Sequence, residues 1–344
     1  MNAKKLAALC MTGVITASML SGCGINANQT VATMEGQTVT LGLVNFIARF
    51  QQAISDDMYR AYFGEDVWEQ DLYGNGSTMA DTFKQNVVDS LHEMYTLKAH
   101  MGEYNVALSA EETAEIDEAV AAFMAANSAD TLKEMGATEE LVKEYLTLSA
   151  IQQKMHEAII AEADTDVSDE EANMRGYTYV QAGIVGYYGE DSNYTYYTED
   201  EVAALKAEFD QMYEEITDPS ELETVAEGYG YSATASAYGT DDDALDENVK
   251  AALDALSEGQ LSSVITTDSA LYIVRVDSET DVDATEENRQ NIIETRQETL
   301  YADTVSAWQE NDGWEVKEKA LQKISFKNGF TAPQEETETE SAAQ

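Results

Sequence analysis

The sequence predicts an α+β protein in which a mainly helical region is followed by a smaller mixed region and then by a long helix. Between residues 41 and 160, apolar residues recur on a 3.6-residue period, which is typical of amphipathic helices. From Asp164 the pattern changes to short strands and helices, in the order β, α, α, β, α, β, β. We therefore place a domain boundary near residue 165.

The first 22 residues have the features of a bacterial signal peptide. Lys4 and Lys5 precede an apolar run, residues 6–19, that is too short to span a bilayer as a helix. Directly after the run stands Leu20-Ser21-Gly22-Cys23, which matches a lipobox: a leucine, two small residues and a cysteine that receives diacylglycerol. We expect cleavage after residue 22, lipidation of Cys23 and a short linker over residues 23–30. The chain would then be anchored at the extracytoplasmic face of the cell membrane.

The composition excludes several classes of function. The formal net charge of −47 repels nucleic acid and anionic lipid headgroups, so we expect no nucleic-acid partner. Cys10 is lost with the signal peptide and Cys23 carries lipid, so the folded part has no cysteine for a disulfide, metal or redox site. A hydrophobic content of 44% indicates a folded chain. The acidic residues 331–344 are predicted to form a disordered tail.

Four helices are predicted in the first region. A strand and turn over residues 31–40 lead into the first helix, whose apolar stripe comprises Leu43, Phe46, Ile47, Phe50 and Ile54. A loop over residues 73–79 precedes the second helix, which ends near Gly102. Ser109 and Glu112 form a capping box at the start of the third. The fourth helix follows Gly136-Ala137-Thr138 and runs to Ile160.

The second region begins with another predicted capping box, Ser168 with Glu171, and a β-rich run over residues 177–188. Thr198 and Glu201 cap a helix, and Pro219 occupies the first position of the next. The remaining elements are a strand at 232–238, a helix at 249–256 stopped by Gly259, and strands at 261–266 and 271–276. A long helix from Thr285 and an extended segment over 314–330 complete the chain.

Several stretches resemble the PrsA/SurA-like extracytoplasmic foldases, which combine a SurA-like helical chaperone domain with a parvulin (PpiC-type) peptidyl-prolyl isomerase domain. Residues 31–52 are similar to the strand, turn and first helix of that family, and residues 91–112 to a later helix and its acidic cap. "LETVAEGYGYSA" and residues 246–276 resemble the middle and end of a parvulin module, and "AWQENDGWEVKEKAL" resembles the helix after it.

This resemblance implies a discontinuous chaperone domain. Residues 30–165 and the C-terminal helix and extension, residues 283–330, would form one body, with the parvulin-like domain inserted as residues 166–282. We expect truncation after Val282 to destabilise the N-terminal helices.

The resemblance also implies an eroded catalytic site. Parvulins place one histidine in the first strand and one in the last; here Gly183 and Tyr272 stand at those positions. Glycine has no side chain, and a tyrosine hydroxyl titrates near pH 10, so the pair cannot replace two imidazoles. The glycine-rich motif has become Ala237-Tyr238-Gly239-Thr240. We assign no catalytic residue and expect weak or absent isomerase activity.

Other residue clusters give weaker signals. His92 and His100 are eight residues apart, which does not match the i, i+4 spacing of a metal pair on a helix. The acidic runs 164–171 and 277–283 lack the glycine of a calcium loop and are interpreted as solvated charge. Tyr187, Tyr188, Tyr194, Tyr196 and Tyr197 form either a loop over the sheet or a surface that stacks on sugars or client aromatics. We expect no metal and no cofactor.

Three functions remain open on the sequence. The first is a lipid-anchored foldase that holds unfolded or newly exported polypeptides in apolar grooves and has little isomerase activity. The second is an active prolyl isomerase that uses other cleft residues. The third is a solute-binding or wall-associated lipoprotein with a borrowed fold.

Overall fold

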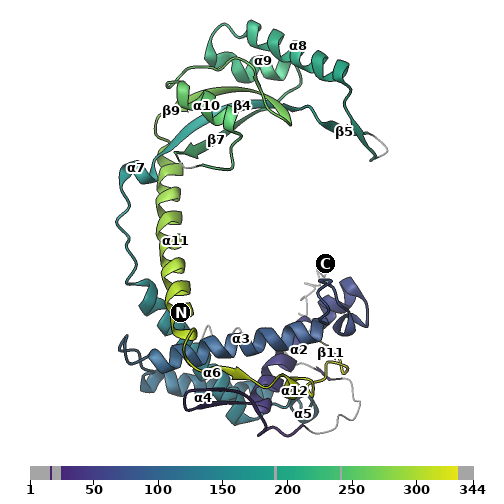
Figure 1. The fold of residues 1–344 in the computed structure, drawn as a ribbon, viewed down its shortest axis with the longest axis vertical. Coiled ribbons are helices and arrows are strands. Elements are labelled where there is room, and N and C mark those ends of the chain that lie inside the picture. Colours follow the sequence, from purple (N-terminus) through teal and green to yellow (C-terminus); the bar gives the residue numbers. More distant parts are fainter. Residues whose placement is uncertain (1–15, 18–24, 190–191, 241, 332–344) are drawn as a thin grey trace, which may run out of the picture. The chain divides into compact units, whose positions relative to one another are not determined.

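The computed structural model describes residues 16–17, 25–189, 192–240 and 242–331. Contacts divide the chain into two compact units, residues 1–163 with 297–344 and residues 164–296 (Figure 1). Helices dominate the first unit and a four-stranded sheet the second, so the α+β class predicted from the sequence is confirmed. Cys23, most of the predicted signal peptide and the tail after Thr331 lie outside the described residues.

The helices of the first unit begin at threonine or serine side chains. Thr40, Thr78, Ser109, Ser128 and Thr138 each accept a hydrogen bond from a backbone N–H in the first turn that follows, which satisfies a donor with no partner inside the helix. The helices are α2 (Leu41–Phe63), α3 (Met79–His100), α4 (Ala110–Ala126), α5 (Ala129–Met135) and α6 (Glu139–Ile160), with a 3-10 turn η1 (Val67–Glu69).

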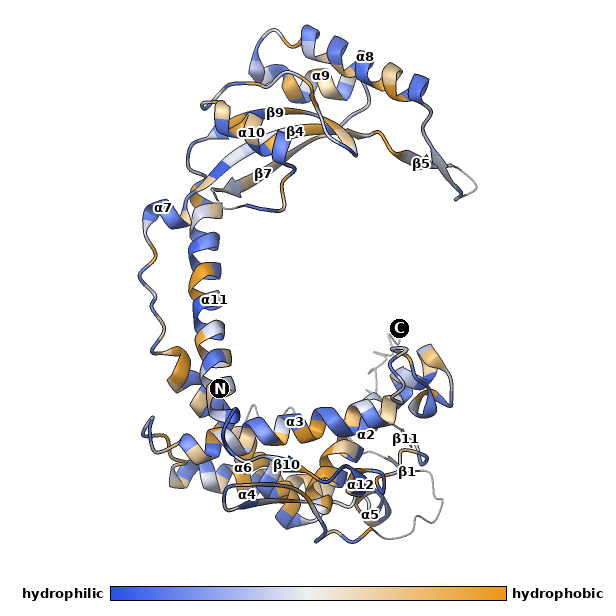
Figure 2. Ribbon diagram, viewed as in Figure 1, coloured by the Kyte–Doolittle hydropathy of each residue, from blue (hydrophilic) through white to orange (hydrophobic). Residues whose placement is uncertain are grey.

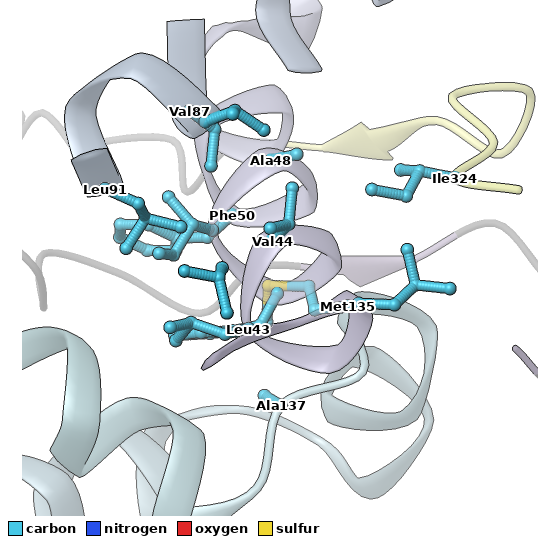
Figure 3. Packing of buried hydrophobic residues seen from close by; sticks show 14 of the residues in the cluster. Leu43, Val44, Ala48, Phe50, Val87, Leu91, Met135, Ala137 and Ile324 are labelled. Carbon is cyan, nitrogen blue, oxygen red and sulfur yellow. The ribbon is translucent and has the colours of Figure 1, made fainter. Parts of the chain in front are cut away.

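Helix α2 is central to the core of this unit. Thirteen of its residues are buried. Leu43, Val44 and Phe50 meet side chains of α3, of α5 and of residues 314–331, which we call the C-terminal segment (Figure 3). A small antiparallel sheet lies beside them, formed by β10 (Glu315–Val316), β2 (Thr30–Met34) and β3 (Gln37–Thr40) in that order. The β10–β2 pairing brings residues 315–316 beside residues 32–33.

A buried polar network fastens the C-terminal segment to α2. Asp56, which is 0% exposed, accepts hydrogen bonds from the backbone N–H of Phe330 at 2.7 Å and from the indole of Trp68. Gln52 donates to the carbonyl of Phe326, and Arg49 donates to the carbonyl of Asn328. Burial lowers the pKa of Arg49 to about 10, although the carboxylate of Glu134 lies 2.9 Å away. These bonds hold β11 (Phe330–Thr331), which also pairs with β1 (Thr16–Ala17).

Three details of the first unit differ from the sequence prediction. Ile54 is 58% exposed, because the buried face of α2 in this turn carries Gln52, Ala53 and Asp56 and Ile54 lies on the other side of the helix. The third predicted helix is two helices, because the side chain of Ser128 caps a new one. The extended segment after Trp314 contains a short helix, α12 (Glu318–Leu321), whose Leu321 is buried in the core.

The second unit is built on an antiparallel sheet with the strand order β7-β4-β9-β8. The strands are β7 (Ala233–Gly239), β4 (Met174–Gly183), β9 (Ala270–Ser278) and β8 (Ile265–Thr266). The helices are α7 (Asp169–Ala172), α8 (Glu199–Glu215), α9 (Leu222–Gly228) and α10 (Glu247–Ala255), with the 3-10 turn η2 (Pro219–Glu221) before α9. The hairpin of β5 (Gly186–Tyr188) and β6 (Tyr194–Tyr196) is separate from this sheet.

Side chains alternate between the two faces of the sheet. Val180, Leu271 and Ile273 pack with residues of α8 and α9, whereas Tyr177, Val274 and Val276 pack with residues of α10. The prediction that the last strand is buried on both faces is therefore confirmed. The strand β9 is followed by the long helix α11 (Val282–Gln309), in which hydrophilic and hydrophobic turns alternate (Figure 2). Its residues 282–296 belong to the second unit and the rest to the first.

The second unit corrects four local predictions. Ser168 caps α7, but Glu171 does not complete the capping box, because its carboxylate lies 2.6 Å from Arg296 on α11. The acidic run 164–171 is therefore partly ion-paired rather than only solvated. Arg296 pairs with Glu171, and Arg289 pairs with Asp169. Helix α10 ends at Ala255, before Gly259. Strand β8 has two residues, and Leu261 forms only an isolated bridge.

Candidate functional site

The two positions assigned to the eroded catalytic site lie on adjacent strands. In the β4–β9 ladder Gly183 pairs with Ala270, and Tyr272 pairs with Gln181. Because pairs two residues apart share a face, Gly183 and Tyr272 are diagonal neighbours on the face that α10 covers. A β-carbon added at Gly183 would meet only the carbonyl oxygen of Ser269, at 4.0 Å. The backbone therefore has room for a side chain at this position, and its absence is not required by packing.

A row of tyrosine rings occupies this face. Tyr272 packs against Tyr179 with ring centroids 6.1 Å apart, Tyr179 against Tyr177 at 5.8 Å, and Tyr177 against Tyr238 at 5.7 Å. Burial is the main reason why the pKa of Tyr272 is raised, with smaller contributions from Tyr179 and Asp246. The hydroxyl of Tyr272 is thus neutral at pH 7, so it provides neither a general base nor a positive charge.

Two arginines tie the sheet to the elements around it. Arg175 donates to the carbonyls of Leu253 and Leu256 and to the hydroxyl of Tyr238, which holds the end of α10 on the sheet. On the opposite face Arg275 forms two hydrogen bonds to the carboxylate of Glu223, and these raise its pKa. Both arginines stabilise the scaffold, and neither lies free for a substrate.

All three histidines of the chain belong to the first unit. His92 stacks on Trp314 with centroids 4.3 Å apart and lies 2.6 Å from Asp312, and His100 stacks on Trp308 at 4.0 Å. His156 contacts Tyr301 edge to face. Each imidazole thus packs against an aromatic ring that belongs to α11 or follows it in the chain. Among the described residues no cluster of three or more metal-ligating side chains occurs.

A pocket of about 500 Å³ lies at the edge of the second unit. The end of α8, the turn η2 and the loop 256–261 form it, and Ile216, Leu256 and Leu261 supply its apolar lining. Neither Gly183 nor Tyr272 lines this pocket. Glu214 is its one acidic lining residue, and no nucleophile paired with a base faces it, so its walls do not provide a catalytic group.

A second feature, which the sequence pattern did not reveal, lies in the first unit. Six large apolar side chains are exposed around the end of α2, and we call them the α2 patch: Ile54 (58%), Met58 (54%), Tyr62 (79%), Phe63 (48%), Leu72 (36%) and Tyr73 (65%). The first three are spaced i, i+4 and i+8, so they share one side of the helix. The sequence analysis assigns Ile54 to the buried stripe and makes no assignment for Met58 or Tyr62. Clustered exposed apolar residues are typical of interaction sites.

Comparison with known proteins finds a family match within the second unit. Residues 188–290 match the family model described as the PPIC-type PPIase domain. The match begins at Tyr188 and so includes Tyr272 but not β4, which carries Gly183. No curated protein matches the chain with significance.

Solved structures with similarity to the chain include two PrsA foldases. The foldase protein PrsA of Lactococcus lactis is 17% identical, with a TM-score of 0.33, over 86% of this chain and 97% of that one. PrsA of Streptococcus pneumoniae is 17% identical, with a TM-score of 0.30, over 87% and 99%. The SurA-like chaperones PEB4 and Cj1289 of Campylobacter jejuni give a match of 11% identity and TM-score 0.29, over 84% and 100%.

Proposed function

We propose that this chain, whose second unit carries a PPIC-type PPIase domain, is an extracytoplasmic foldase that holds unfolded polypeptides on its helical first unit. The observation that carries the proposal is the α2 patch. Its six side chains are exposed beside a well-packed core, so their exposure is not a consequence of poor packing. Water-exposed apolar surface gains free energy when it covers apolar segments of another chain, and unfolded clients offer such segments.

Residues 30–165 and 283–330 form the holding domain in this proposal, and residues 166–282 the parvulin-like domain. The side chains of the two domains support different roles. The first unit offers apolar contact, whereas the sheet face at Gly183 and Tyr272 offers hydroxyls and no imidazole. We therefore favour a holding function with weak or absent isomerase activity over an active isomerase.

The α2 patch is tested by aggregation of an unfolded client. We expect the double variant Met58→Ser/Tyr62→Ser to require about tenfold more protein for the same suppression of aggregation, because two apolar contacts are lost. Light scattering of a chemically denatured, diluted client measures the effect. Val282→Ser is the matched control, since Val282 is equally exposed, at 75%, but lies outside the patch. Equal suppression by the double variant and the wild type would contradict the proposed function.

Anchoring at the extracytoplasmic face of the membrane belongs to the same proposal. It rests on the lipobox, and no helix among the described residues has the length and apolar character needed to cross a bilayer. Cys23→Ala should shift the protein from the membrane fraction to the soluble fraction or leave its signal peptide uncleaved, because the acyl chains provide the anchor. Membrane fractionation and intact-mass measurement test this expectation. A variant with unchanged fractionation and unchanged mass would rule out lipidation at Cys23.

A further inference from the structure

The hairpin of β5 and β6 presents an aromatic surface that the fold does not use. It follows β4 directly and extends beyond the four-stranded sheet (Figure 1). Its register pairs Gly186 with Tyr196, Tyr187 with Thr195 and Tyr188 with Tyr194. Because directly paired residues share a face, Tyr188, Tyr194 and Tyr196 lie on one side of the hairpin and Tyr187 lies on the other.

The three tyrosines on one side form a continuous platform. The ring centroids of Tyr188 and Tyr194 are 5.0 Å apart, and those of Tyr194 and Tyr196 are 5.1 Å apart. Tyr188 is 73% exposed, Tyr196 72% and Tyr194 42%. On the other side, Tyr187 packs against Tyr197 at 5.2 Å. We call the first three residues the tyrosine platform.

Gly186 is needed for this arrangement. A β-carbon at Gly186 would clash with the carbonyl oxygen of Thr195 and would lie 3.0 Å from the ring of Tyr194. The ring of Tyr194 therefore lies over the glycine, in space that any other residue would fill. A hairpin of two short strands gains little stability by itself, and contacts between the three rings add only about 0.2–1 kcal/mol each. These contacts do not require the outer faces of the rings to lie in water. Their arrangement is better explained by contact with a ligand.

Charge indicates the nature of that ligand. Glu199, Asp200 and Glu201 follow the hairpin in the first turn of α8 and are exposed. Their carboxylates attract a basic partner at long range, whereas a neutral partner such as a glycan gains no such attraction from them. Tyrosine-lined surfaces also bind proline-containing extended segments, whose backbone loses little entropy on binding. We propose that the tyrosine platform binds extended polypeptide segments that contain proline and lysine or arginine. This inference rests on the proposed function, because such segments would belong to its clients.

The experiment uses the full chain and a fluorescein-labelled peptide of Lys-Pro-Pro repeats. We expect Tyr188→Ser/Tyr196→Ser to weaken binding by about tenfold, because two stacking contacts are removed. Tyr187→Ser is the matched control on the opposite side of the hairpin and should bind as the wild type does. The single variants Y188S and Y196S should each give an intermediate loss. A peptide of Lys-Gly-Ser repeats with the same charge should bind more weakly than the proline peptide.

Four outcomes would overturn the inference: equal binding by the wild type and the double variant, equal loss in the Tyr187→Ser control, equal affinity for the two peptides, or binding of an N-acetylglucosamine oligomer in place of the peptide. Circular dichroism confirms that the variants fold.

Failure of this inference is distinguishable from failure of the proposed function. A protein that suppresses aggregation through the α2 patch but binds no proline peptide contradicts the inference alone, whereas a protein that suppresses no aggregation contradicts the proposed function.

Discussion

Asp56→Ala should lower the free energy of unfolding of the first unit by about 3–5 kcal/mol, the range expected when one partner of a buried charged network is removed. Asp56 is fully buried and accepts hydrogen bonds from Trp68 and from the backbone of Phe330. Without the carboxylate, both donors are left without an acceptor, and Arg49 loses a nearby negative charge. We therefore expect the segment around β11 to detach from α2 before the rest of the unit unfolds.

Urea denaturation followed by tryptophan fluorescence measures this effect. Trp68, Trp308 and Trp314 are the only tryptophans of the chain, and all belong to the first unit, so the signal reports that unit. Asp57→Ala is the matched control, because Asp57 is the next residue of the same helix and is exposed. Its effect should stay within about 0.5 kcal/mol. A loss for Asp56→Ala no larger than that of the control would show that the network does not hold the C-terminal segment.

The full chain should leave the cis–trans exchange of model prolyl peptides at its uncatalysed rate, which corresponds to tens to hundreds of seconds at 25 °C. An isomerase lowers the barrier of about 18–20 kcal/mol for rotation about the amide bond, and the parvulins that this domain resembles use an imidazole pair for the purpose. Gly183 has no side chain, and Tyr272 presents a hydroxyl whose pKa is raised by burial, so it stays uncharged at neutral pH. The sheet keeps its buried apolar side chains but carries no imidazole at these two positions.

Peptide exchange followed by NMR or by a coupled protease assay tests this expectation. Tyr272→Phe is the control, since it removes only the hydroxyl from the tyrosine row. Wild type and variant should both give the rate of buffer alone. Acceleration comparable to that of an ordinary parvulin, lost in Tyr272→Phe, would restore the enzyme as the better hypothesis and would assign the hydroxyl a role in the reaction.

Local patterns allowed much of the fold to be predicted from the sequence. The capping boxes at Ser109 and Thr198 are present as expected, because both partners of such a box lie within four residues. The box expected at Ser168 is incomplete, because Arg296, more than a hundred residues away, takes the carboxylate of Glu171. Ile54 shows the same dependence on distant residues, because its exposure is decided by which face of α2 the other elements cover.

Gly183 and Tyr272 are assigned to the site positions only by resemblance to the parvulins, and that assignment stays a prediction. The sequence by itself determined the class of the fold and most of the helices and strands. These features depend on periodicity, capping and residue type, all of which are local. Only the tertiary structure decided that Asp56 fastens β11 to α2, that the α2 patch is exposed, and that Tyr188, Tyr194 and Tyr196 share one side of a hairpin. Each of these depends on strand register or on contacts between distant residues, because burial and pairing are properties of the whole fold.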